Sequence, residues 1–244
     1  MSDAIVVMKR YEMKYILTKD QVDYLVEALK GHMMVDQYGL TSVASLYFDT
    51  SSSRLIRTSI EKPQFKEKIR LRSYGLASKD SNVYLEIKRK ANGIVYKRRV
   101  ETKIDEVDKL FNNQDNEFAS GQIANEIRRF RDYYEKLIPS CLIIYERVGY
   151  YEENGKLRLT IDYNPRYRRD NLRLDYSMDG KPLLDEGSAI LEIKVQDAIP
   201  LWLSHILDEG KIYINSFSKY GKAYEELIKT AREEGNYYVW FNIC

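Results

Sequence analysis

Histidine and cysteine are scarce in this chain of 244 residues, which contains two of each. His32 and His205 are too few for a histidine-rich zinc site, and they leave only two candidates for an enzyme that forms a phosphohistidine. Cys141 and Cys244 supply neither a disulfide framework nor a Cys-x-x-Cys metal knuckle. The sequence therefore argues against the common metal sites built on these two residue types.

Long hydrophobic runs are also missing. No stretch of about 18 apolar residues could span a bilayer, and the first residues, MSDAIVVMKRYE, lack the apolar segment of a signal peptide. We therefore expect a cytoplasmic protein with no membrane segment in this chain. Neither GxxxxGK[ST] nor GxGxxG occurs, which disfavours a P-loop kinase and a dinucleotide-binding fold.

The net charge is close to zero, at +2 with histidine neutral. A protein that binds nucleic acid through a basic exterior usually has a larger positive net charge, so we expect no nucleic-acid partner. Any concentration of basic residues must be local. We find no low-complexity linker, composition break or internal repeat, and one domain over residues 1–244 is the simplest interpretation.

The pattern of apolar residues predicts an α+β protein. Strands are expected at 5–17, 43–49, 66–74, 83–90, 93–101, 141–151, 156–163 and 191–195. Helices are expected at 18–32, 51–62, 104–112, 120–137, 200–210 and 217–235. Residues 166–176 could add a strand, although RYRRD at 166–170 is interpreted as a solvated loop, or as a guide for polyphosphate. Thr18 and Gln21 form a capping-box pattern at the start of the first helix.

The expected strands share one unusual feature, which is a mostly basic polar face. In KEKIRLRSY (66–74) the cations alternate with Ile69 and Leu71, which point to the other side. A solvated sheet face is the ordinary explanation for one such strand. The same division recurs in VYLEIKRK, VYKRRVE, YERVG, KLRLTID and LEIKV. Repetition over so many strands favours a shared purpose for these faces.

A barrel would bring the basic faces together in its interior and turn the apolar faces outward under the helices. We expect this architecture, an antiparallel β-barrel tunnel with a basic interior and helices packed on its outside. Like charges about 4 Å apart cost roughly 4 kcal/mol at an effective dielectric constant of about 20. About ten cations therefore need a polyanion between them. A nucleic-acid duplex is too wide for such a bore, whereas a phosphate chain fits.

The ordered motifs resemble a known family. The chain resembles the VTC domain over about residues 9–225. The motifs that carry the resemblance are, in order, RYEMKY, YFDT, KEKIRLRSY, LEIKRK, VYKRR, YERVGY, LRLTID, LEIKV and FSKYG. This domain is the polyphosphate polymerase branch of the triphosphate tunnel (CYTH-like) metalloenzymes. The resemblance implies a β-barrel tunnel and a Mn²⁺ or Mg²⁺ ion that bridges a bound triphosphate.

The resemblance also implies roles for individual residues. The residues that it places on the phosphates as catalytic cations are Lys14, Arg70, Arg72, Lys88, Lys97, Arg147, Arg158 and Lys219. Further substrate-binding residues are Arg10, Lys68, Arg99, Tyr145, Lys194 and Ser218. Glu192 is the expected main metal ligand, with Glu12 as a second. Lys90, Arg98 and Arg99 are as compatible with the surface as with the tunnel, and Asp162 with a structural role as with a place beside the metal.

Two departures from the family pattern matter. Ser216 stands where family members carry a lysine two positions before the serine of the Ser-Lys pair, so one contact to the acceptor is missing. Arg10 replaces the first carboxylate of the Glu-x-Glu-x-Lys motif that is typical of the hydrolytic branch. This should weaken a second metal site and the activation of water, and favour phosphate as the nucleophile.

The expected function is an ATP-dependent polyphosphate polymerase, with ATP and inorganic polyphosphate as its ligands. Two alternatives stay open. One is a tripolyphosphatase or nucleoside triphosphatase of the same fold, and the other is a polyphosphate-binding module without catalytic activity.

Overall fold

The computed structural model describes residues 11–61, 63–92, 94–112, 118–153 and 155–235. The chain divides into two compact units, and each draws on three segments. Among the described residues, unit 1 contains 11–41, Tyr145–Pro165 and Leu184–Phe217, and unit 2 contains Ser42–Ile144, Arg166–Leu183 and 218–235. The expectation of a single domain stays a prediction.

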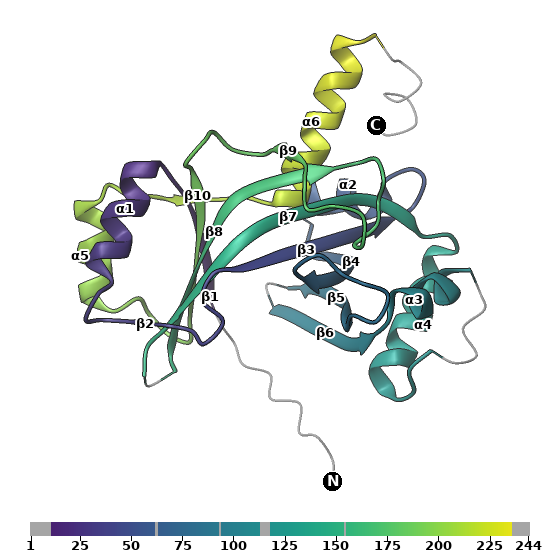
Figure 1. Ribbon diagram of the computed structural model, residues 1–244, viewed down its shortest axis with the longest axis horizontal. Helices are drawn as coiled ribbons and strands as arrows, with labels where there is room; N and C mark the ends of the chain where they lie inside the picture. Colours follow the sequence, from purple (N-terminus) through teal and green to yellow (C-terminus); the bar gives the residue numbers. More distant parts are fainter. Residues whose placement is uncertain (1–10, 62, 93, 113–117, 154, 236–244) are drawn as a thin grey trace. The chain divides into compact units, whose positions relative to one another are not determined.

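Unit 1 is built mainly from strands that are covered by two helices (Figure 1). Its elements are β1 Tyr11–Leu17, α1 Lys19–Ala28, β2 Met34–Val35, β10 Ala189–Val195, α5 Leu201–Glu209 and β11 Ile214–Asn215. It also contains the end of β7 Ile138–Tyr151 and most of β8 Leu157–Arg168. The hydrogen-bonded order of these strands is β11-β1-β10-β8-β7, and β2 pairs with β7.

Unit 2 contains most of the remaining chain. Its elements are β3 Thr41–Asp49, α2 Arg54–Ile60, β4 Phe65–Tyr74, β5 Val83–Ala91, β6 Ile94–Thr102, α3 Ile104–Phe111, α4 Gln122–Tyr134, β9 Lys181–Pro182 and α6 Lys219–Glu233. The order of its main strands is β7-β3-β4-β5-β6.

The described strands form one large antiparallel sheet, which together with six helices confirms the α+β class. The order runs from β11 to β6, and within the described part of the chain no pairing joins these two end strands. The closed barrel therefore stays a proposal. No helix in the described ranges is long and apolar enough to cross a membrane.

Local signals place most elements as expected. Thr18 caps α1, since its hydroxyl accepts a hydrogen bond from the Gln21 amide at 3.3 Å and its own amide donates to the Gln21 side chain at 3.0 Å. This confirms the predicted capping box. Residues 5–10 of the first predicted strand lie outside the described residues, as does Arg10.

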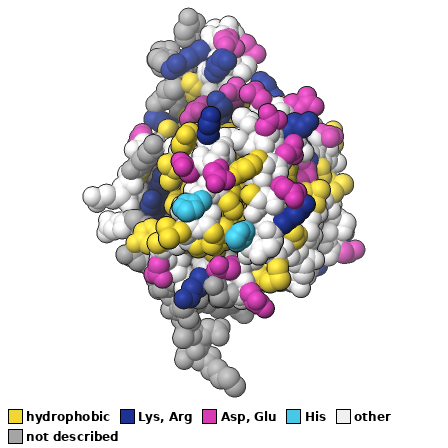
Figure 2. All heavy atoms as spheres, turned by 90° about the vertical axis from the view of Figure 1, so that its left-hand side faces the viewer, with side chains coloured by type: hydrophobic (Ala, Val, Ile, Leu, Met, Phe, Trp, Pro, Cys, Tyr) yellow, Lys and Arg dark blue, Asp and Glu magenta, His cyan; other side chains and the backbone are white. Residues whose placement is uncertain are grey.

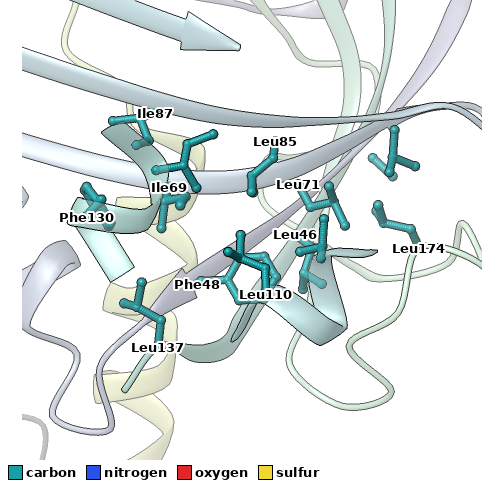
Figure 3. Close-up of a cluster of buried hydrophobic side chains, with 14 of the residues drawn as sticks. Leu46, Phe48, Ile69, Leu71, Leu85, Ile87, Leu110, Phe130, Leu137 and Leu174 are labelled. Atoms are coloured by element: carbon teal, nitrogen blue, oxygen red, sulfur yellow. The ribbon is translucent and has the colours of Figure 1, made fainter. Parts of the chain in front are cut away.

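Each unit has its own hydrophobic core, and each core lies on the apolar face of its strands. In unit 1, Leu25 of α1 and Leu203 of α5 are fully buried with Leu159 and Ile193 of the sheet. In unit 2, α3 and α4 supply Leu110, Ile127 and Phe130 to a core that includes Ile69, Leu71, Leu85 and Ile87 (Figure 3). The alternation within each strand therefore leaves the basic side chains on the opposite face.

The interpretation of residues 166–170 as a solvated loop was wrong for the first three of them. Arg166, Tyr167 and Arg168 form the end of β8, so they extend this strand and do not add a separate one. The side chain of Arg168 is buried, and its guanidinium donates to backbone carbonyls of the loop that follows. Those of Asp170, Ser177, Asp179 and Asn171 each lie 3.1 Å from a donor nitrogen. The cation thus organises a loop.

Removal of a buried side chain under α4 should destabilise the fold. Ile127 is fully buried, so Ile127→Ala should lower the free energy of unfolding by about 2 to 5 kcal/mol through lost burial and the cavity left behind. Denaturant unfolding followed by circular dichroism measures this change. Arg129→Ala, at an exposed position of the same helix, should stay within about 0.5 kcal/mol of the unmodified protein. Equal effects of the two substitutions would contradict the packing described here.

Candidate functional site

The candidate residues fall into two groups, one in each unit, and each group surrounds a buried glutamate. We call the group in unit 2 the Glu86 cluster, which consists of Tyr47, Lys68, Arg70, Arg72, Glu86, Lys88, Lys97 and Arg99. We call the group in unit 1 the Glu192 cluster, which consists of Glu12, Lys14, Tyr145, Arg147, Arg158, Asp162, Glu192 and Lys194.

Strand register brings the Glu86 cluster together. Arg70 of β4 lies opposite Tyr47 of β3 on one side and opposite Glu86 of β5 on the other. Glu86 in turn lies opposite Arg99 of β6. Because paired residues of antiparallel strands point to the same face, these side chains meet on the face opposite the core. Lys68, Lys88 and Lys97 share this face, one row further along.

The carboxylate of Glu86 is the centre of this cluster. Arg70 donates to its Oε2 from Nε at 2.9 Å, and Nη2 of Arg70 forms an ion pair with the same oxygen at 2.8 Å. The ammonium of Lys97 lies 2.9 Å from Oε1, and Nη1 of Arg72 lies 3.9 Å from Oε2. Only 1% of the Glu86 side chain is exposed. Burial raises the pKa of this carboxyl, but the charges of Arg70, Arg72 and Lys97 outweigh burial and lower it to about 2.

Tyr47 also belongs to the cluster, although the sequence did not indicate it as a site residue. Its phenol accepts a hydrogen bond from Nη1 of Arg70 at 3.0 Å, and its ring stacks on Tyr220 with centroids 4.5 Å apart. Burial raises the pKa of the phenol, but the charges of Arg70, Lys68 and Arg72 outweigh burial and lower it from 10.0 to about 8. The alternation of β3 places Tyr47 on the same face as the cations of β4. With 21 tyrosines in the chain, this position alone does not mark Tyr47 as a site residue.

The start of α6 lies at the same cluster. Ser218 caps this helix, since its hydroxyl accepts from the Gly221 amide at 3.1 Å, and Lys68 donates to the same hydroxyl at 3.3 Å. A Cβ on Gly221 would come within 3.2 Å of the Ser218 Cβ, so the glycine packs closely against the capping serine. Lys219 is the first residue of α6. A helix start combined with two lysines is suited to an anion.

A buried aspartate fixes this helix start. Tyr220 donates to Asp49 at 2.9 Å, and the amides of Leu55 and Ile56 donate to the same carboxylate at 2.8 and 3.0 Å. Asp49 thereby joins the end of β3 to both α2 and α6. Burial raises the pKa of Asp49, and these hydrogen bonds oppose that increase.

The Glu192 cluster repeats the arrangement of a glutamate among cations in unit 1. Lys14 of β1 lies opposite Glu192 of β10, and Glu12 lies opposite Lys194. The Lys14 ammonium lies 3.4 Å from Glu12 and 3.9 Å from Glu192, and Lys194 forms an ion pair with Glu192. Burial raises the pKa of the Glu192 carboxyl, but Lys194 and Lys14 outweigh it and hold this pKa well below its usual range.

Arg147, which is partly exposed, forms an ion pair with the buried Asp162 in this cluster. Nε and Nη2 of Arg147 donate to the two oxygens of Asp162 at 2.5 and 2.8 Å, so the guanidinium is held as a fork. The guanidinium also lies 5.1 Å from the ring centre of Tyr145, which is buried. Asp162 thus positions a predicted phosphate contact.

A cavity of about 230 Å³ opens beside Arg158 in unit 1. Its lining residues are Tyr151, Gly155, Lys156, Leu157, Arg158 and Lys194. Arg158 is more than half exposed, and its guanidinium lies 3.5 Å from Asp36. Three cations therefore border one opening, where they could contact an anion.

Several charged or polar residues lie away from these clusters. Arg98 points to the helical side of the sheet, where it pairs with Glu126 of α4 at 3.4 Å, so its tunnel interpretation was wrong. Lys66 of the row 66–74 donates to the carbonyl of Ser59, at 3.1 Å. His32 stacks on Trp202, with ring centres 4.4 Å apart. Figure 2 shows histidine at the surface among hydrophobic side chains.

The arrangement of basic strand faces around buried carboxylates agrees with the comparison with protein families. The family model of the VTC domain matches residues 9–228, which is most of the chain. The chain belongs to the VTC domain family. No curated protein sequence matches it significantly.

Solved structures show which fold this VTC domain has. A Bacillus halodurans protein, named for a suspected adenylate cyclase activity, shares 14% identity with a TM-score of 0.53, and the match covers 85% of this chain and 92% of that protein. A suspected adenylyl cyclase from Hippeastrum, described as having a dominant triphosphatase activity, shares 17% identity with a TM-score of 0.51 and covers 87% and 93%. The fold is therefore CYTH-like, the fold of the triphosphate tunnel proteins.

The Glu192 cluster has the donor chemistry for the divalent metal that the family implies. Glu12 and Glu192 offer ionised carboxylate oxygens, and Mg²⁺ commonly uses one or two carboxylates together with phosphate and water. The hydroxyl of Thr160, opposite Glu192 on β8, is buried and has no hydrogen-bond partner among the described residues. The described residues contain no group of three or more acidic, histidine or cysteine side chains that could hold a metal. Two carboxylates would leave the other positions of such a metal to substrate phosphate and water.

The phenol of Tyr47 should ionise at a lower pH than an unperturbed tyrosine does. We expect a spectrophotometric titration to show one tyrosinate forming around pH 8, because nearby cations stabilise its charge. Tyr47→Phe should remove this step. Tyr134→Phe should leave it unchanged, because burial raises the pKa of Tyr134. Persistence of the step in Tyr47→Phe would contradict the assignment.

Proposed function

We propose that this VTC domain is an ATP-dependent polyphosphate polymerase, which transfers the γ-phosphate of ATP to a growing polyphosphate chain in a basic tunnel. The observation that carries the proposal is the charge of the Glu86 cluster, in which six cations share a sheet face with one carboxylate. Such an excess of positive charge favours a polyanionic ligand. The Glu192 cluster offers a second set of cations for phosphate within unit 1.

The reaction needs positioning and charge stabilisation more than proton transfer. A terminal oxyanion of the polyphosphate attacks the γ-phosphorus in line, and the bond to the β–γ bridging oxygen breaks, so ADP leaves with the electron pair. The attacking oxygen is already ionised near neutral pH, so no general base is required. Arg70 and Arg147, which carboxylates hold in fixed orientations, are the proposed cations for the phosphate oxygens. A mechanism without a general base agrees with the position of the two histidines, which are not members of either cluster.

The Glu192 cluster also has a place in this scheme. Glu192, with Glu12, would hold Mn²⁺ or Mg²⁺, which supplies charge neutralisation at phosphate oxygens. Lys14 already contacts both carboxylates, so it lies where it can contact a phosphate that binds beside them. ATP and inorganic polyphosphate are the proposed ligands. The cytoplasmic location expected from the sequence stays a prediction.

Triphosphate hydrolysis is the second candidate, because the Hippeastrum protein with the same fold is described as a triphosphatase. Arg10 in place of the first carboxylate of the hydrolytic motif favours polymerisation over hydrolysis. The two reactions differ in the acceptor of the γ-phosphate, which is a phosphate chain in one and water in the other.

Analysis of the products distinguishes these functions. We expect the purified protein with ATP and Mn²⁺ to form long chains, visible on a gel stained for polyphosphate, with little free phosphate. Glu192→Gln should reduce chain formation by about 100-fold or more, since even the outer partners of metal ligands contribute about 10- to 100-fold. The matched control is Glu186→Gln, at an exposed position of unit 1, which should retain full activity.

If the reaction releases free phosphate and forms no chains, the protein is a triphosphatase and the polymerase proposal is wrong. Binding of polyphosphate without any product would indicate a binding module. If Glu192→Gln forms chains at the full rate, Glu192 is not a required metal ligand, but the polymerase function still holds.

A further inference from the structure

Glu86 is an unexpected residue in a phosphate-binding cluster, because its negative charge repels the ligand. It is nevertheless the most buried charged side chain of the cluster, and it contacts three of the assigned phosphate-binding cations. Its pKa near 2 keeps it ionised at any physiological pH. A role for this carboxylate must therefore apply to its charged form.

The contacts of Arg70 indicate the first part of that role. Its Nε donates to Glu86, its Nη2 forms an ion pair with the same carboxylate, and its Nη1 donates to Tyr47, so all three guanidinium nitrogens are held within the cluster. Arg72 is held between Glu86 and the hydroxyl of Ser45, which accepts from Nε at 3.2 Å. Glu86 thus fixes the directions of two forks before any ligand arrives, which lowers the entropy lost on binding.

Lys97 indicates the second part. Its side chain is about half buried, and this partial burial together with the charges of Arg70 and Arg72 lowers its pKa from 10.5 to about 8. Glu86 opposes this decrease. The charged groups of the cluster on the same face as Lys97 are Glu86 and Lys88 on β5, Lys68, Arg70 and Arg72 on β4, and Arg99 on β6 itself. The Tyr47 phenol on β3 lies behind Arg70. Glu86 is the acidic group among these neighbours.

We propose that Glu86 is a positioning residue that serves as the standing counter-anion of the cluster, and that a phosphate chain binds with uptake of a proton at Lys97. The inference rests on the proposed function only in taking this cluster as the phosphate-binding site. An arriving phosphate adds negative charge beside Lys97, so the bound state holds the proton more tightly than the free state does.

The direction of the pH dependence follows from the sign of this change. With a free pKa of about 8 and a higher value in the complex, the free protein binds fewer protons than the complex above about pH 8, so affinity falls as pH rises. If Lys97 stays protonated in the complex, the decrease is about tenfold between about pH 7 and about pH 9. Without Glu86 the free Lys97 loses its proton at lower pH, and the decrease becomes larger.

Calorimetric titration with tripolyphosphate, without divalent metal, tests this proposal. Two buffers of different ionisation enthalpy give the number of protons taken up at each pH. Lys97→Arg is the matched control, because its guanidinium keeps its proton and the titration of tripolyphosphate itself cancels in the comparison. We expect the unmodified protein to take up more protons than Lys97→Arg near pH 8 to 9, and to lose about tenfold more affinity over about pH 7 to 9.

The Glu86→Gln variant separates positioning from simple structural support. It should move the onset of proton uptake to lower pH by about one unit or more, and Glu86→Asp should restore the original onset in part. A merely structural role would weaken binding at every pH without moving this onset. The comparison of the unmodified protein with Lys97→Arg decides the proton uptake even if Glu86→Gln does not fold.

Each remaining outcome has a defined meaning. Equal proton uptake in the unmodified protein and Lys97→Arg would overturn the coupling, and an unmoved onset in folded Glu86→Gln would overturn the role of Glu86. No binding of tripolyphosphate would overturn both this inference and the proposed function. If tripolyphosphate binds with proton uptake at Lys97 but ATP gives no chains, this inference holds and the polymerase proposal is wrong.

Discussion

The contact of a buried carboxylate with several cations is the interaction on which both clusters depend. Cations on adjacent strands repel one another, and this repulsion grows as the surroundings become less polar. Glu86 in unit 2 and Glu192 in unit 1 each lower this repulsion, and each is the first residue of a Glu-Ile-Lys segment. A folded chain can therefore keep a strongly basic face while the ligand is absent.

The two glutamates differ in what surrounds them, and this difference supports different roles. Glu86 is held by two guanidinium groups and one ammonium, so its oxygens are committed to positioning. Glu192 is held by two lysines, which are flexible point charges, and a second carboxylate, Glu12, lies on the far side of Lys14. A metal can compete with lysine at Glu192 more easily than with the arginine fork at Glu86.

Much of this fold could be predicted from the sequence, because alternation and helix periodicity report which face of an element is apolar. The same signals placed Arg70, Lys97 and Glu86 on one face. They could not show which cation turns toward which acid, because that choice depends on strand register. Arg168 illustrates the same limit, since the carbonyls that bury its charge belong to a loop with no pattern of its own. Tyr47 acquires its acidity from cations on another strand.

The segmented composition of the two units has a practical consequence for dissecting this protein. Each unit is assembled from three stretches of chain, and β7 and β8 both contribute residues to each unit. A single cut therefore cannot produce a fragment that contains one complete unit and nothing of the other. Truncation would damage both cores at once, and the contribution of either cluster has to be measured by point substitution in the intact chain.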